Sequence, residues 1–182
     1  MASFLRVRQS EFNLRSRLNE LDYDRIPYEK MPAGSIVQSK IKYTNNATWS
    51  SSNASWTSIG PVSGQVDFTM KITPKFHNSI LVFETDMTTN LNDDDGYARF
   101  RLVDLNHPNG TTVFHSNTYC AASHYKISTD DWINTHICTK GPVQHMGEHN
   151  LVLQVYIYNG GTLSFSWSGA DYRTVKVTEI RQ

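Results

Sequence analysis

The fold class is decided by the stretch Gln65-Val66-Asp67-Phe68-Thr69-Met70-Lys71-Ile72, in which polar and apolar residues alternate. Successive side chains of a β-strand point to opposite faces, so this period of two places the apolar residues on one face and the polar residues on the other. The same alternation returns in residues 151–157, 163–167 and 175–177. Because glycine-containing turn signals separate these three segments, we predict a C-terminal meander of three strands.

Further segments rich in β-branched and aromatic residues lie between clusters of Asp, Asn, Gly and Pro, which is typical of strands and turns. They are residues 35–43, 80–86, 97–103, 111–115, 124–127 and 132–138. The total is about nine or ten strands. A single sheet of that many strands would twist strongly, whereas two facing sheets bury their apolar faces against each other. We therefore predict an all-β domain over residues 33–182, a jelly-roll-like two-sheet sandwich.

The composition excludes several functions. The 182 residues contain 17 Lys and Arg against 17 Asp and Glu, so the formal net charge is zero. No basic field is present to hold nucleic acid or an anionic membrane. The first residues lack a signal-peptide core, and no apolar run is long enough for a membrane helix, so we expect neither secretion nor membrane insertion. In such a chain Cys120 and Cys138 are expected to be unpaired and buried in the core.

Residues 1–32 differ from the rest in charge density and period. Ser10 is a good helix cap, and Leu14, Leu18 and Leu21 recur at helical spacing before Pro27 and Pro32. A helix of about two turns is marginal in water, so this arm must pack on its own domain, on sister chains or on another protein. The candidate attachment residues of this short helical arm are Phe4, Leu14, Leu18 and Leu21.

No spacing of residues predicts a catalytic site. The stretch from His145 through Glu148 to His149 matches a zinc-peptidase pattern, but those ligands need a continuous helix, and Gly147 interrupts it. The acidic run Asp93-Asp94-Asp95 lies out of register for a calcium loop, which makes a solvated hairpin loop the better reading and a surface cation site the alternative. We therefore predict no enzyme activity, no catalytic residues, no bound metal and no cofactor.

Aromatic residues in polar segments give one alternative function. Trp49 and Trp56 lie in a stretch rich in Ser, Thr and Asn, and exposed rings on β-sandwiches stack on sugar faces. These two tryptophans are the candidate glycan contacts. Burial in the core or in a subunit interface is the competing interpretation.

The body resembles small β-rich fibre, appendage or decoration proteins of tailed bacteriophages, especially those of cyanobacterial hosts. The resemblance rests on five short motifs across residues 33–182, and it departs from the family pattern at residues 76–78. The motifs are Gly34-Ser35-Ile36-Val37-Gln38, Met70-Lys71-Ile72-Thr73-Pro74-Lys75, Ser79-Ile80-Leu81-Val82, Phe100-Arg101-Leu102 with Asn109-Gly110-Thr111, and Thr174-Val175-Lys176-Val177-Thr178-Glu179-Ile180.

Membership of that family would imply a non-enzymatic virion structural protein, assembled in the host cytoplasm and commonly a homotrimer. The expected role is a surface component that decorates or cements the capsid, or forms a short fibre. Its partners would be sister subunits and another virion protein such as the capsid or a tail or baseplate hub. The alternative is a carbohydrate-binding module of a tail fibre that attaches to a host surface glycan.

Overall fold

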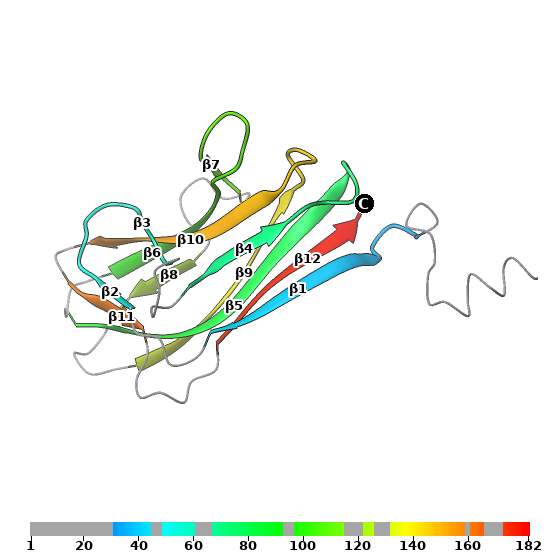
Figure 1. The fold of residues 1–182 in the computed structure, drawn as a ribbon. Helices are drawn as coiled ribbons and strands as arrows, with labels where there is room; N and C mark the ends of the chain where they lie inside the picture. The colour runs from blue at the N-terminus through cyan, green and yellow to red at the C-terminus, as the bar shows by residue number, and fades with distance from the viewer. Residues whose placement is uncertain are drawn as a thin grey trace, which may run out of the picture. The chain divides into compact units, whose positions relative to one another are not determined.

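The computed structural model describes residues 31–44, 49–60, 67–92, 97–114, 122–125, 132–158, 161–165 and 173–182. These residues form twelve strands and no helix, and none of them belongs to a helix that could span a membrane. By its internal contacts the chain divides into Met1–Pro32 and Ala33–Gln182. The strands of the second unit are shown in Figure 1.

The strands make two antiparallel sheets, named here by their central strands. In the β5 sheet, the order is β1-β12-β5-β11-β2, and β9 also pairs with β5. In the β10 sheet, the order is β3-β10-β6-β7, with β4 on β10 and β8 on β6. The strands are β1 Ile36–Thr44, β2 Trp49–Ser51, β3 Thr57–Ser58, β4 Thr69–Ile72, β5 Ser79–Leu91, β6 Tyr97–Asp104, β7 Thr112–Val113, β8 Ala122–Tyr125, β9 Trp132–Pro142, β10 His149–Tyr158, β11 Leu163–Phe165 and β12 Arg173–Arg181.

The core lies between the two sheets. Along β5, buried and partly exposed residues alternate over the whole strand, and Phe83 has no exposed surface. Phe68, next to β4, packs on Phe165 of β11 in the other sheet, with ring centroids 5.6 Å apart. Burial of such aromatic and aliphatic side chains is the main force that holds the sheets together. The all-β, two-sheet prediction is therefore confirmed.

Three details of the sequence prediction are wrong. The C-terminal segments do not form a meander, because β10 lies in one sheet while β11 and β12 pair with β5 in the other. Cys138 is exposed, since its place in β9 alternates with the buried Ile137. The polar stretch that contains Trp49 and Trp56, where no strand was predicted, forms β2 and leads into β3.

A row of side chains links β1 of the β5 sheet to β4 and the residue after it in the β10 sheet. Gln38, Lys40 and Lys42 alternate along β1 and donate to backbone carbonyls two residues apart. The acceptors are the carbonyls of Thr73 at 2.7 Å, Lys71 at 2.9 Å and Thr69 at 2.7 Å. These bonds occupy carbonyl groups on the side of β4 away from β10, where an edge strand would otherwise be open to pairing with another chain.

Candidate functional site

An aromatic–arginine surface covers the outer face of strands β6 and β10. It consists of Trp56, Tyr97, Arg99, Arg101, Tyr156 and Tyr158, all of them partly exposed. Alternation places these side chains outside, because their neighbours in β6 and β10, such as Phe100 and Val155, are fully buried. The surface therefore follows directly from strand register, with Tyr97 opposite Tyr158.

One half of the surface is a pair of stacked tyrosines. The rings of Tyr97 and Tyr158 lie 4.1 Å apart and are inclined by 11°. The guanidinium of Arg99 lies 5.3 Å from the first ring centre and 5.1 Å from the second. Its Nη1 donates to the hydroxyl of Tyr158 at 3.4 Å. Cation–π attraction and this bond hold the arginine over the rings.

The other half is centred on Trp56, just before β3. The guanidinium of Arg101 lies 4.3 Å from the indole centre, and the ring of Tyr156 meets the indole edge-on at 5.7 Å. Arg101 Nε also donates to Gln154 at 2.9 Å, whose amide donates to Ser58 at 3.2 Å. Burial lowers the pKa of Arg101, although an arginine remains charged at any ordinary pH. Flat rings beside fixed donors suit the stacking and hydrogen bonding of a planar or cyclic polar ligand.

One of the two candidate glycan contacts belongs to this surface. Trp56 belongs to it, whereas Trp49 lies in β2 of the other sheet. The other five residues of the surface were missed, although the tyrosines at alternate positions of residues 154–158 carried the signal. The candidate arm residues Phe4, Leu14, Leu18 and Leu21 and the acidic run 93–95 lie outside the described residues.

A second group of polar side chains is buried where β6 ends and β10 begins. Oδ2 of Asp104 lies 2.7 Å from Nδ1 of His149 and 3.1 Å from Nε2 of His145. Oδ1 of Asp104 accepts from the backbone N–H of Asn150 at 2.9 Å and of Asn106 at 3.0 Å. The rings of His145 and His149 stack at 4.0 Å. The segment 143–148 is a loop rather than a helix, as predicted.

The electrostatics of this Asp–His cluster favour ionised Asp104. Burial opposes ionisation, but the bonds from Asn150, Asn106 and His145 and the charge of His149 together lower the pKa of the Asp104 carboxyl. His149 Nε2 faces the backbone carbonyl of His145 at 2.9 Å, so both of its ring nitrogens lie beside oxygen atoms. The sequence could not reveal this cluster, since Asp104 is distant along the chain.

Comparison with known proteins gives weak structural matches only. No family model and no curated protein matches the chain. A structure of the infectious bursal disease virus Gx strain matches with a TM-score of 0.45 and 11% identity, over 86% of this chain and 40% of that one. The VP2 subviral particle of that virus matches at 0.42 and 10%, over 81% and 38%. A Bacteroides thetaiotaomicron protein described as a proposed sugar binder matches at 0.34 and 13%, over 84% and 90%.

The chain thus spans about two fifths of the length of the two viral chains. These likenesses assign neither a family nor a function to it.

Proposed function

We propose that the chain is a non-enzymatic structural protein of a bacteriophage particle. In this proposal a jelly-roll-like sandwich, present as a homotrimer, decorates or cements the capsid or forms a short fibre. Residues 1–32 attach it to a capsid protein or a tail or baseplate hub. The observation that carries the proposal is the convergence of three of the phage-like sequence motifs on one buried carboxylate, that of Glu179.

Glu179 lies in β12 and has no exposed surface. Its Oε2 accepts from the amide of Gln38 at 2.6 Å, and its oxygens accept from the backbone N–H of Lys75 at 2.9 and 3.0 Å. Oε1 also accepts from the N–H of Phe76 at 3.1 Å. The Gln38 amide bridges onward to the carbonyl of Thr73. One carboxylate thus joins the first strand, the turn after β4 and the last strand.

The residues that meet at Glu179 belong to three of the motifs on which the resemblance rests. Gln38 ends the first motif, Thr73 and Lys75 belong to the second, and Glu179 belongs to the last. Short strand motifs recur by chance when each is counted alone. Motifs that depend on each other through a buried charge form one structural unit, because losing any partner leaves a buried polar group unpaired. The residues that carry the resemblance therefore form one structural unit in this chain, and this supports the proposed virion role.

The test is the location of the protein in purified particles. Virus particles that encode the chain would be purified by two rounds of density-gradient centrifugation. Quantitative mass spectrometry would then give its copy number, and an antibody to the recombinant chain would locate it on the particle. We expect the chain in intact particles at a copy number divisible by three, with label on the particle surface. Its absence from particles that contain all their other structural proteins would contradict the proposal.

The aromatic–arginine surface favours a second function, a carbohydrate-binding module that attaches a tail fibre to host glycans. Binding to a glycan array would be measured for the wild type and for Trp56→Ala and Arg101→Ala, with Leu105→Ala, exposed outside this surface, as control. If this function holds, the first two changes abolish binding and the control preserves it. Trp49→Ala tests whether the other candidate glycan contact also takes part in binding. No bound glycan with the wild type, or binding that survives both changes, would reject the module.

A further inference from the structure

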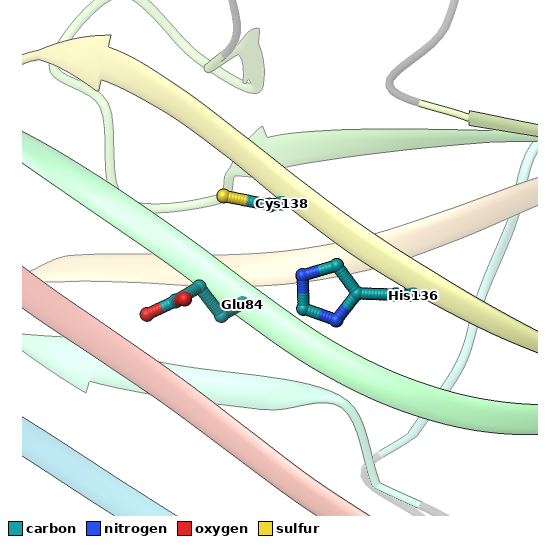
Figure 2. Close-up of side chains that lie close together, drawn as sticks. All are labelled: Glu84, His136 and Cys138. Carbon is teal, nitrogen blue, oxygen red and sulfur yellow. The ribbon is translucent and has the colours of Figure 1, made fainter.

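Four polar side chains meet on the outer face of the β5 sheet. In the antiparallel pair of β5 and β9, Glu84 is directly opposite Cys138, and Asp86 is directly opposite His136. Figure 2 shows the side chains of Glu84, His136 and Cys138, which come from these two neighbouring strands. Glu84 is partly exposed, and His136 and Cys138 are exposed. One ligand atom from each of these three lies within 4.8 Å of the other two.

Asp86 fixes the orientation of the histidine ring. Its Oδ1 lies 2.7 Å from Nδ1 of His136, so a carboxylate there favours the tautomer with the proton on Nδ1. The lone pair is then on Nε2. A carboxylate behind a histidine is the arrangement that orients histidine ligands in zinc sites and increases their basicity.

We propose that Glu84, His136 and Cys138 bind a zinc ion, with Asp86 as the orienting group behind His136. Thiolate, imidazole and carboxylate are the ligand types that zinc takes, at about 2.0 to 2.3 Å. Around a tetrahedral ion such ligands are about 3.3 to 3.6 Å apart. Rotation of exposed side chains supplies the small contraction that this requires. Three protein ligands leave the fourth position for water.

The charges of this site suit a divalent cation. A coordinated thiol is deprotonated, so the thiolate and the Glu84 carboxylate together neutralise the two charges of zinc. Lys176 pairs with Oε2 of Glu84 at 2.9 Å, which leaves Oε1 for the metal. Lys176 and Glu84 are 39% and 32% exposed, so the lysine head can turn to water when the ion enters.

The other group of metal-binding types, Asp104, His145 and His149, is a poorer host for a cation. Both Asp104 oxygens and both ring nitrogens of His149 already take part in hydrogen bonds. A metal there would have to displace these bonds. The sequence predicted no metal because no ligand spacing was recognisable. The strand pairing brings Glu84 close to residues more than fifty positions later, which spacing does not reveal.

The probe is Co²⁺ added to the full-length, metal-free chain, followed by competition with Zn²⁺. We expect the visible bands of a tetrahedral ion and a near-ultraviolet sulfur-to-cobalt charge-transfer band, both removed by one equivalent of zinc. Cys138→Ser should remove the charge-transfer band, and His136→Ala should abolish binding. Asp86→Asn should weaken zinc binding by about 10- to 100-fold. Cys120→Ser, which changes the other cysteine, should leave spectrum and affinity unchanged.

Circular dichroism of each variant establishes that the fold is kept, which we expect since these side chains are on the outer face. Two outcomes would overturn the proposal. One is the absence of any cobalt spectrum and of zinc binding in the wild type. The other is binding that is unchanged in Cys138→Ser but lost in His145→Ala, which would assign the metal to the Asp–His cluster.

Discussion

Nδ1 of His149 lies 2.7 Å from Oδ2 of Asp104, and neither side chain has any exposed surface. The same pair of atom types lies at the same 2.7 Å between His136 and Asp86, where the side chains are 56% and 69% exposed. The two pairs thus differ chiefly in burial. Removing one partner of a buried pair strongly destabilises the folded protein. Removing one partner of an exposed pair changes the stability little.

Asp104→Asn should therefore lower the free energy of unfolding by about 3 to 5 kcal/mol, because it removes a buried carboxylate that faces His149 and accepts two backbone N–H bonds. Asp86→Asn, the matched change in the exposed pair, should cost less than about 1 kcal/mol in metal-free protein. Urea unfolding at pH 7 measures both. Equal losses in the two variants would show that burial does not determine the strength of the Asp104 pair.

Stability should depend on pH through Asp104. Its pKa is lowered in the folded protein, so the unfolded chain takes up a proton at a higher pH than the native one. The contribution of Asp104 is complete above the unfolded value of about 3.9 and is lost as pH falls through the lower native pKa. The carboxyl ¹³C shift of Asp104 should titrate below pH 3.8, the ordinary value of the group. A midpoint above that value would contradict the hydrogen-bonding account.

Glu179 gives a second test of a buried carboxylate. Glu179→Gln replaces one acceptor oxygen by an NH₂ group that faces the donors of Gln38, Lys75 or Phe76. We expect a loss of about 2 to 4 kcal/mol, since hydrogen bonds to a charged group are lost and donors are left unpaired. Glu148→Gln is the control, because the side chain of Glu148 is 45% exposed and pairs with the exposed side chain of Lys71. The control should change stability by less than about 1 kcal/mol. Similar thermal melting of both variants would refute a structural role for Glu179.

The period of two revealed the strands because each sheet is buried on one face. Composition added segments 80–86 and 97–103, which lie within β5 and β6. Neither signal told which sheet a strand joins, since β10 and β12 have similar alternation and lie in different sheets. Strand pairing is decided by contacts between distant segments, and local pattern carries no record of it. The short strands β2 and β3 escaped because two or three residues give no period.

The same reason limited the prediction of sites. Trp56 was found because a tryptophan in a polar stretch is conspicuous by itself. Strand pairing within one sheet brings Asp104 close to His149, and strand pairing within the other brings Glu84 close to Cys138. Outer positions such as Arg99 and Tyr158 also look like ordinary solvated strand residues until the register puts them in contact.

The oligomeric state is predicted to be a homotrimer, and β1 is the strand we expect at its interface. Of the four exposed large hydrophobics among the described residues, Ile36, Ile41 and Tyr43 lie on β1. Changing Ile41 and Tyr43 together to Lys should convert the trimer to a monomer without lowering the melting temperature of the sandwich. Leu105→Lys is the control, as Leu105 is exposed elsewhere. Sedimentation distinguishes the cases. A wild type that is monomeric at micromolar concentration would refute the trimer, and a trimeric double variant would exclude β1.

The last prediction concerns the arm, residues 1–32. The described strands pair only with one another, and the first of them begins at Ile36. A chain of residues 33–182 should therefore keep the β-sheet circular-dichroism signal and melt cooperatively, yet fail to enter particles. Burying Leu14, Leu18 and Leu21 contributes roughly 4 to 9 kcal/mol at about 1.5 to 3 each, less the cost of ordering the arm. Such an anchor suits attachment through several linked copies. If the shortened chain does not fold, the arm belongs to the core. If it folds and enters particles at full occupancy, attachment runs through the loops of the sandwich.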